Sequence, residues 1–476
     1  MMRQAFRHIL AAACCIGILG LSPAVQAQGT AFGLGAAKIP DAGKSADRTQ
    51  GLRFGQSVFH AGLALELGWD SNPLYASNKD TSSAYLRLTP QLSLGTKKTG
   101  EDKLPFVVYN LSLGLDYVGY LQELSSSSSK DRHMVGATAG AGLEFNPQGI
   151  LRFALMETFT RTNEPRAGVD YGYNRDYNVL GFDMTWNPGK GFIDVLLGYR
   201  FILDFFEDPS GDTSANELAA FNAMRHEVKL KVAWRFFPKT AFWAQIDTGY
   251  LDYMRDFNEV SLGTMAAGNR SSTPLRAMVG VTGRLTPFLI ADVGIGYRGF
   301  FYSEKLENEF PGADFVEDAH HDVAAHVSTT WQIAPTVGLR LGYQHDSHDS
   351  LVGDYYKADS VHFATLMEFF DRRLQLKAGI AWSLINYKGL FYTDTTGDGC
   401  TVVSGNISSC ERKDNYLIVD IGATYYFLNW LSVGLGYQML GNFTDFETVY
   451  TGAGEPRVQQ PSFSKHRVFG LVQVYY

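Results

Sequence analysis

Beyond its N-terminus, this sequence lacks any uncharged segment approaching the roughly 20 apolar residues that a transmembrane helix needs. It also lacks the regular apolar spacing of amphipathic helices, although a soluble chain of 476 residues would normally form roughly two or three domains with helices. The mildly negative net charge of −8 gives no indication of nucleic-acid binding. These absences argue against a helical membrane protein and against a nucleic-acid-binding protein.

The N-terminus is typical of a secretory signal peptide. Arg3 and Arg7 precede an uncharged run over residues 9–21, and Val25-Gln26-Ala27 supplies the small residues that signal peptidase recognises. We therefore expect residues 1–27 to be a signal peptide that is cleaved after Ala27. The run is too short to span a bilayer.

Cysteine is scarce, and the sequence contains four. Cys14 and Cys15 would leave with the signal peptide. Cys400 and Cys410 lie in a Gly-, Ser- and Thr-rich stretch, and two such cysteines in an oxidising compartment usually form a disulfide. The alternative is a pair of free thiols.

Glycine, tyrosine and phenylalanine are abundant, with 49, 25 and 32 residues, and apolar residues recur at alternate positions from about Phe59 onward. In residues 227–236, for example, Val228, Leu230 and Val232 alternate with charged residues. In an extended strand this period of two places apolar residues on one face and polar residues on the other. One face therefore suits hydrocarbon and the other suits water.

About 18 such segments follow one another, most of them roughly 10 to 15 residues long, which is the length and even number of a single-chain outer-membrane barrel. Besides those near Phe59 and Glu227, they begin near Ala84, Val107, Arg132, Leu151, Leu180, Phe192, Phe242, Leu275, Leu289, Asp322, Val337, Val361, Leu374, Leu417, Leu431 and Lys465. The predicted fold is all-β: a single transmembrane antiparallel up-and-down β-barrel over residues 57–476. Residues 28–56 show no convincing strand and are predicted to be a periplasmic tail or a segment folded into the lumen.

Short and long connections alternate, as outer-membrane barrels require of periplasmic turns and external loops. Tight turns are predicted at residues 146–149, 187–189, 238–239, 286–287, 334–335, 371–372 and 429–430, with a longer one at 97–104. Long polar loops are predicted at residues 71–83, 122–131, 162–174, 206–221, 255–272, 303–319, 346–359, 388–413 and 442–464. Both termini would then be periplasmic.

The last segment alternates small or apolar residues and ends on the aromatic Tyr476. This resembles the C-terminal signal that the outer-membrane assembly machinery selects. The expected location is therefore the cell outer membrane, with outer-membrane lipids and that machinery as partners.

A barrel of about 18 strands is too wide for side chains to fill, so a water-filled lumen is expected. Charged residues predicted to face it include Arg87, Arg200, Lys229, Lys231, Arg235, Asp247, Asp292, Arg298, Arg340 and Glu368. Inward basic residues slightly exceed acidic ones, which favours anions weakly. The alternative is that most of these charges pair across strands and simply solvate the wall.

No spacing in the sequence selects a catalytic triad, so an enzyme is not predicted. His320, His321 and Asp322, and the cluster that begins at His345, match no tight metal-ligand template, so we interpret them as solvated residues. No metal or cofactor is predicted. A plugged transporter is disfavoured because its plug needs well over about a hundred N-terminal residues.

The opening motif Gly68-Trp69-Asp70-Ser71-Asn72-Pro73, followed by Leu86-Arg87-Leu88-Thr89-Pro90, resembles the start of the beta-barrel porin type-two family. In that family the motif is aromatic-Asp-Asp-Asn, and Ser71 replaces the second Asp here. The resemblance implies an exopolysaccharide-secretion barrel that works with a periplasmic polysaccharide-export protein. A general or selective uptake porin is the alternative, and a surface receptor or structural barrel with a loop-closed pore is the alternative from another class.

Overall fold

The computed structural model describes residues 51–73, 75, 82–96, 104–122, 133–162, 174–188, 191–207, 221–254, 270–303, 319–350, 353–393, 395–396, 400–404, 407–446, 448–450, 457–459 and 462–476. They all belong to one compact unit, Ile39–Tyr476. The predicted signal peptide with its cleavage site after Ala27 lies outside the described residues.

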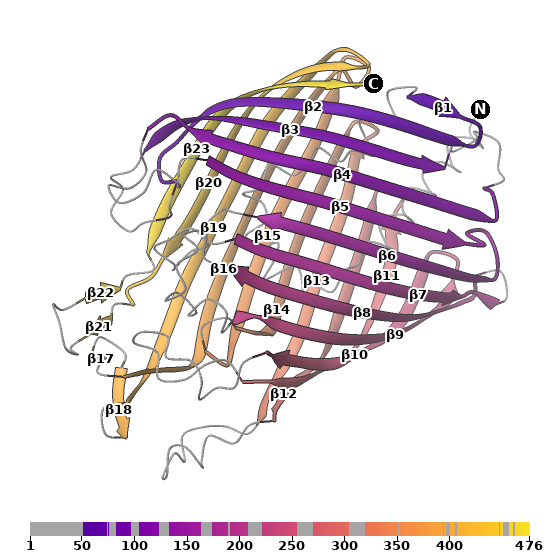
Figure 1. Ribbon diagram of the computed structural model, residues 1–476. Helices are drawn as coiled ribbons and strands as arrows, with labels where there is room; N and C mark the ends of the chain where they lie inside the picture. The colour runs from indigo at the N-terminus through magenta and orange to yellow at the C-terminus, as the bar shows by residue number, and fades with distance from the viewer. Residues whose placement is uncertain are drawn as a thin grey trace. The chain divides into compact units, whose positions relative to one another are not determined.

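The described residues form a closed antiparallel barrel of 18 strands (Figure 1). In order around the wall these are β2 Ser57–Asp70, β3 Ser83–Thr96, β4 Val107–Tyr120, β5 His133–Phe145, β6 Leu151–Thr162, β7 Asn174–Trp186, β8 Ile193–Glu207, β9 Ala223–Phe237, β10 Thr240–Tyr253, β11 Ser272–Thr286, β12 Leu289–Tyr302, β13 Ala319–Ala334, β14 Val337–Asp349, β15 Tyr355–Phe369, β16 Leu374–Thr393, β19 Ile407–Leu428, β20 Leu431–Phe443 and β23 Phe463–Tyr475. Each strand pairs with its neighbours in the chain, and β23 pairs with β2. The predicted barrel and strand number are confirmed.

Five shorter strands accompany the barrel. β1 Leu52–Phe54 pairs with β2, and β18 Cys400–Ser404 pairs with β19. β17 Thr395–Thr396, β21 Thr448–Tyr450 and β22 Arg457–Gln459 form a small separate sheet. No strand was predicted before residue 57, so β1 is a correction. Gly55 makes this short hairpin possible because its φ of 60° suits the tight turn between Phe54 and Ser57.

Long and short connections alternate around the barrel, as predicted. We call the end with short connections the turn side and the other the loop side. Two predicted loops are wrong in extent: most of residues 346–359 belongs to β14 and β15, and most of 388–413 belongs to β16, β18 and β19. Polar composition led to both errors, because these strands continue beyond the apolar part of the wall.

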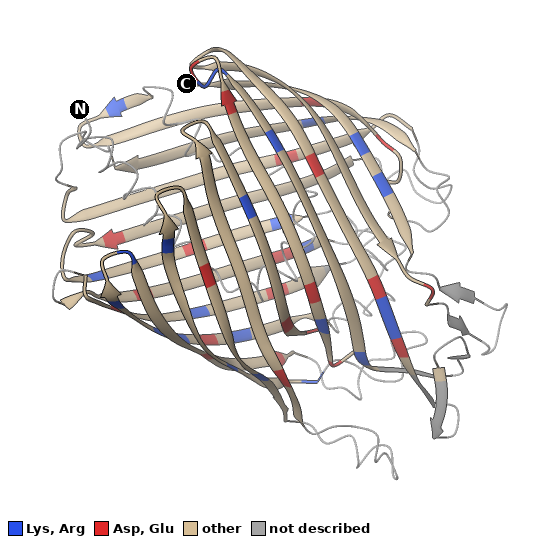
Figure 2. Cartoon of the chain, turned by 180° about the vertical axis from the view of Figure 1, so that it is seen from behind, with Lys and Arg blue, Asp and Glu red and all other residues tan. Residues whose placement is uncertain are grey.

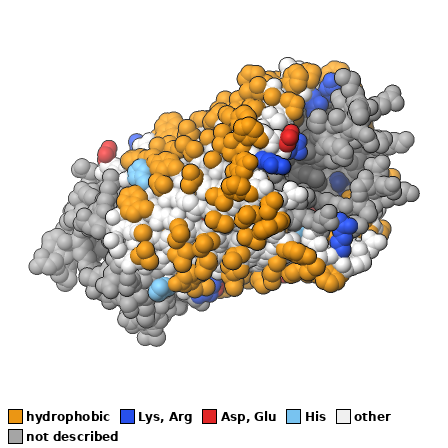
Figure 3. Space-filling view, turned by 90° about the horizontal axis from the view of Figure 1, so that it is seen from above, with side chains coloured by type: hydrophobic (Ala, Val, Ile, Leu, Met, Phe, Trp, Pro, Cys, Tyr) orange, Lys and Arg blue, Asp and Glu red, His pale blue; other side chains and the backbone are white. Residues whose placement is uncertain are grey.

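The outer wall is covered by exposed apolar side chains, and on the side of the barrel seen in Figure 3 the charged side chains lie mainly towards the two ends. Leu67, Leu115, Ile295 and Leu435, for example, are 60%, 49%, 60% and 71% exposed. Such a surface is unfavourable in water and suits hydrocarbon. The architecture is therefore that of an outer-membrane barrel. In the part of the chain that the structure describes, no helix is both long and apolar enough to cross a bilayer.

The seam between the first and last barrel strands carries a buried charge cluster. Asp70, at the loop-side end of β2, is fully buried and accepts bonds from Lys465 at 3.0 Å and Arg467 at 2.9 Å, both on β23. Asn72 continues the contact, because its amide group donates to the carbonyl oxygen of Ser464 at 3.2 Å. The barrel is thus closed by side chains as well as by the backbone ladder.

We predict that Asp70→Asn weakens this closure, because it removes the buried carboxylate that Lys465 and Arg467 share. Breaking a buried ion pair in this way costs about 3 to 5 kcal/mol. The temperature at which the folded barrel loses its compact mobility on a denaturing gel should fall clearly. Glu411→Gln, at an exposed ion pair with Lys388, is the control and should change that temperature little. Equal midpoints for both variants would contradict a role for Asp70 in closure.

Candidate functional site: the barrel lumen

Charged residues of both signs are spread along the barrel strands (Figure 2). The strand registers and the alternation of exposed apolar residues place the predicted lumen residues on the inner face. Several form ion pairs there. Arg87 binds both carboxylate oxygens of Asp116 at 2.7 and 2.5 Å, and Arg200 binds those of Asp183 at 2.8 Å. These charges therefore form ion pairs that make the inner wall hydrophilic.

Further predicted residues form a network on β9 to β12. Asp247 lies 3.7 Å from both Lys229 and Arg276. The ammonium group of Lys231 lies 4.9 Å from the ring centroid of Trp243, whose indole donates to Asp292 at 3.0 Å. Carboxylates and an aromatic face therefore surround these lysines.

The remaining predicted lumen residues lie nearer the turn side or are more exposed. Arg235 pairs with Asp194 at 2.6 Å, although its side chain is 45% exposed. Glu368 accepts from Gln375 at 2.8 Å and lies 3.3 Å from Arg372. Arg340 is exposed and makes no ion pair with any described residue. Arg235 and Arg340 are therefore the predicted arginines most open to a solute.

The wall divides at one place on the loop side, between β13 and β14. Their ladder runs from Ala334 and Val337 only to Ala325 and His345, whereas β14 stays paired with β15 as far as Asp349 and Tyr355. Beyond His345, the β14–β15 hairpin leaves β13. The described part of its end, residues 346–350 and 353–358, we call the inner hairpin.

The contacts of the inner hairpin show that it lies on the lumen side of the wall. Ser347 donates to Asp322 at 2.8 Å, and the ring of Tyr355 stacks on that of His320 at 3.8 Å. Lys357 lies 3.2 Å from the same Asp322. Ser347, Tyr355 and Lys357 belong to the hairpin face that would otherwise point out of the barrel, whereas His320 and Asp322 point in. The hairpin therefore forms a second layer inside β13.

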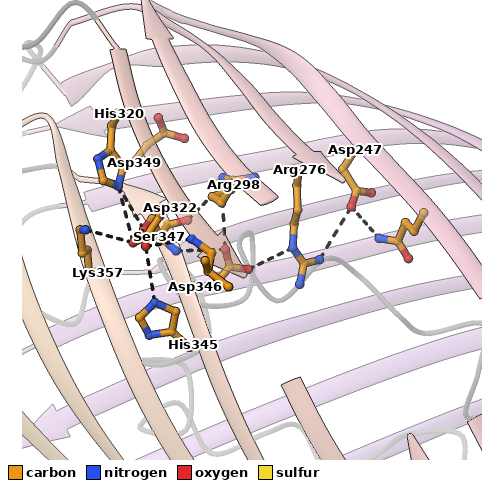
Figure 4. Close-up of polar contacts among 12 residues, drawn as sticks. Asp247, Arg276, Arg298, His320, Asp322, His345, Asp346, Ser347, Asp349 and Lys357 are labelled. Atoms are coloured by element: carbon orange, nitrogen blue, oxygen red, sulfur yellow. Dashed lines mark hydrogen bonds and ion pairs between the residues drawn. The ribbon is translucent and has the colours of Figure 1, made fainter. Parts of the chain in front are cut away.

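Arginines of neighbouring strands hold the inner hairpin by its carboxylates (Figure 4). Arg276 on β11 lies 3.1 Å from Asp346, and Arg298 on β12 donates to the carbonyl oxygen of Ser347 at 3.0 Å. Asp346 is only 1% exposed. A buried carboxylate is favourable only beside such cations.

The anchoring extends further along the wall. Asp349 accepts from Ser272 on β11 at 3.0 Å and lies 3.6 Å from Arg225 on β9. At the hairpin turn, Arg270 holds both oxygens of Asp354, at 2.8 and 2.5 Å. The inner hairpin thus crosses the inner face from β13 to β9 and occupies part of the loop-side lumen.

The inner hairpin was not predicted, because the polar composition of residues 346–359 indicated a solvated loop. His345, Asp346, His348 and Asp349, which form the first part of the hairpin, do stand out in the sequence as a cluster. The informative signal was three aspartates within nine residues, facing strands whose inward positions are rich in arginine. Such a segment need not lie in solvent.

Cys400 and Cys410 are joined by a disulfide that links β18 to β19. The bond lies in the extension of β16 and β19 beyond the wall. It closes a ring of ten residue steps around the β18–β19 turn. The disulfide takes no part in the contacts of the inner hairpin or in the other lumen contacts described above.

No protein-family model and no curated protein matches this sequence. Solved structures with a similar fold include the FrpB iron transporter from Neisseria meningitidis, at 10% identity and a TM-score of 0.45 over 91% of this chain and 83% of that one. The siderophore receptor PirA from Pseudomonas aeruginosa has 7% identity and a TM-score of 0.40 over 88% and 80%. OccAB4 from Acinetobacter baumannii has 9% and 0.41 over 88% and 98%. Similarity at this level identifies neither site nor cargo.

We predict that Arg270→Ala releases the inner hairpin, since Arg270 and Asp354 form a buried two-point ion pair. The readout is maleimide labelling of a thiol introduced as Ser350→Cys, which is buried in the anchored state. Labelling should accelerate more than about tenfold, because about 1.4 kcal/mol of lost anchoring suffices for that change. Arg161→Ala, which breaks the Arg161–Asp176 pair elsewhere on the barrel, is the matched control. If both variants label at the original rate, Arg270 does not hold the hairpin.

Proposed function

We propose that this protein is an outer-membrane channel that passes hydrophilic solutes through its lumen. The observation that carries the proposal is an apolar outer wall around a charged inner wall in an 18-strand barrel. Barrels of 16 to 18 strands generally enclose an aqueous channel. Paired charges such as Arg200 and Asp183 make that wall hydrophilic without giving it a strong electrostatic potential of one sign.

The inner hairpin would set the width of this channel on the loop side. Asp346, Asp349 and Asp354 are held by arginines, so the hairpin is fixed in place rather than free to fluctuate. A solute would pass beside this layer. The same layer is the one observation that favours the alternative of a receptor with a closed pore.

Exopolysaccharide secretion with a periplasmic polysaccharide-export partner is the more specific form of the proposal, and it rests on the resemblance of residues 68–90 alone. Asp70 and Asn72 of that motif contact the last strand. The motif therefore bears on barrel closure and carries no information about cargo. Uptake of small solutes would use the same lumen.

Planar-bilayer recording of the purified protein tests the channel. We expect a steady conductance, and we expect the triple variant Asp346→Asn, Asp349→Asn, Asp354→Asn to conduct more, because its hairpin loses the carboxylates that hold it inside. Glu411→Gln, at the exposed pair with Lys388, serves as the control and should conduct like the natural protein. Absence of conductance in both the natural protein and the triple variant would favour the receptor.

A polymer conduit and a small-solute porin differ in what blocks them. Long neutral polysaccharide chains added on the turn side should interrupt the current of a secretion channel in long events. Monosaccharides at equal mass concentration are the control. If neither interrupts the current, polysaccharide secretion is contradicted while the channel stands.

Ion selectivity should depend on the arginines that are most open to solutes. Arg340→Glu adds a negative charge where no described ion pair compensates it, so the reversal potential in a salt gradient should shift towards cations. The same exchange at the buried Arg87 would break its bond to Asp116 and is therefore unsuitable. Arg340→Gln separates loss of a positive charge from gain of a negative one. An unchanged reversal potential in both variants would place Arg340 outside the ion path.

A further inference from the structure

A ring of aromatic side chains surrounds the outer face of the barrel near the loop side. It includes Trp69, Tyr117, Tyr199, Tyr250, Tyr297 and Tyr437, one on each of six strands that run from the turn side to the loop side. In all but Tyr117, a glycine precedes the aromatic residue. Each lies on the same face as the exposed apolar residues of its strand.

The position of these residues along their strands places the ring at a membrane boundary. Tyr199 follows the start of β8 by six positions, and Tyr117 follows the start of β4 by ten. Trp69, twelve positions after the start of β2, is the furthest along its strand. With about 3.4 Å per residue and a tilt of about 40°, the six aromatics lie roughly 16 to 31 Å above the turn-side end, in the upper part of an apolar band about 25 Å tall and at its upper edge. Aromatic girdles of outer-membrane barrels lie at the level of the headgroups.

Four of the tyrosines share one further feature, a histidine on the next strand. The phenol oxygen lies within hydrogen-bond distance of the imidazole Nδ1 in Tyr117–His133 at 2.8 Å, Tyr199–His226 at 2.8 Å, Tyr297–His321 at 2.6 Å and Tyr437–His466 at 2.9 Å. In every case the tyrosine faces a valine across the ladder, and the histidine stands two positions before that valine. One arrangement therefore recurs on four separate hairpins.

The hydrogen bond determines what the imidazole offers to its surroundings. A tyrosine hydroxyl that donates to Nδ1 fixes the neutral tautomer in which Nε2 carries the proton. His133 and His321 are exposed, and His226 and His466 are partly exposed, on the lipid-facing side. In this tautomer each unit has an N–H donor at Nε2 on the lipid-facing side of the barrel.

The girdle itself does not need these histidines. Tyr250 belongs to the same ring and lies opposite His226 in the β9–β10 ladder, yet it makes no hydrogen bond with any described residue. Tyr343 donates to Asp359 at 2.7 Å, and Asp359 stands at the position that histidine occupies in the four units. A tyrosine at this level is therefore accommodated without a hydrogen bond to an imidazole. The imidazole adds a nitrogen donor to the lipid-facing side of the barrel.

We propose that the four Tyr–His units bind phosphate groups of outer-leaflet lipid headgroups, so that the barrel carries a ring of anionic-lipid sites continuous with its apolar wall. The inference rests on the outer-membrane location and is independent of conductance. Phosphate suits the units because hydrogen bonds to an ionised acceptor are roughly twice as strong as neutral ones. The rings of Tyr and His also provide a flat apolar surface for the adjoining acyl chains.

The test compares lipid retention by the full-length folded protein in native mass spectrometry after extraction from two kinds of vesicle. One contains phosphatidylglycerol in a digalactosyl-diacylglycerol background, and the other contains digalactosyl diacylglycerol alone. The natural protein should retain phosphatidylglycerol in preference to the galactolipid. The variant His133→Phe, His226→Phe, His321→Phe, His466→Phe should lose about fivefold in affinity per site, the equivalent of about 1 kcal/mol for one net hydrogen bond.

Two further variants keep the test decisive if the variant with all four histidines replaced fails to fold. The set Tyr117→Phe, Tyr199→Phe, Tyr297→Phe, Tyr437→Phe keeps all four imidazoles but not their orientation, and should lose part of the preference. Tyr250→Phe, which lies opposite His226 in the same ring but makes no hydrogen bond to it, should keep all of it. Equal retention of the two lipids by the natural protein, or a loss with Tyr250→Phe as large as with the tyrosine set, would overturn the proposal. Neither result would bear on the channel.

Discussion

Closure of the barrel is the constraint on which the rest of this structure depends. In hydrocarbon no water is present to satisfy backbone N–H and C=O groups, so a sheet can cross a membrane only if its first and last strands pair. Here β2 and β23 meet that need, and Asp70 binds both Lys465 and Arg467 across the joint. This cluster lies at the loop-side end, just beyond the apolar wall, where charged groups are least costly.

Closure also explains how the inner hairpin can exist. A strand that leaves the ladder within the apolar band would leave backbone groups unsatisfied, but β14 leaves β13 only after His345, on the loop side. Beyond His345, β14 faces polar partners. The carboxylate of Asp346 interacts with Arg276 and Arg298 in place of water. β14 therefore separates from β13 at a level where the unpaired backbone groups of β14 face the lumen and not the lipid.

The fold could be predicted from the sequence because its physical cause is periodic. Alternation located all 18 strands, and those beginning at Val107, Leu289 and Leu431 started where predicted. Strands β7, β15 and β19 begin before their predicted starts, because their loop-side ends are polar and lie above the lipid. Alternation with an apolar face reports contact with hydrocarbon, so it ends where the hydrocarbon ends, even if the strand continues.

The site was less predictable because its contacts join distant segments. The alternation along β12 predicted that Arg298 faces the lumen. Nothing local indicated that Asp346, two strands away from Arg298 and three from Arg276, would pair with both of them. The Tyr–His units are less predictable from the sequence than the strands and more predictable than the lumen contacts. Their Gly-aromatic and His-x-Val patterns repeat visibly, for example at Gly296-Tyr297 and His321-Asp322-Val323, but only the register shows that the two patterns meet. A repeat within strands is therefore informative about function once it is read across a hairpin.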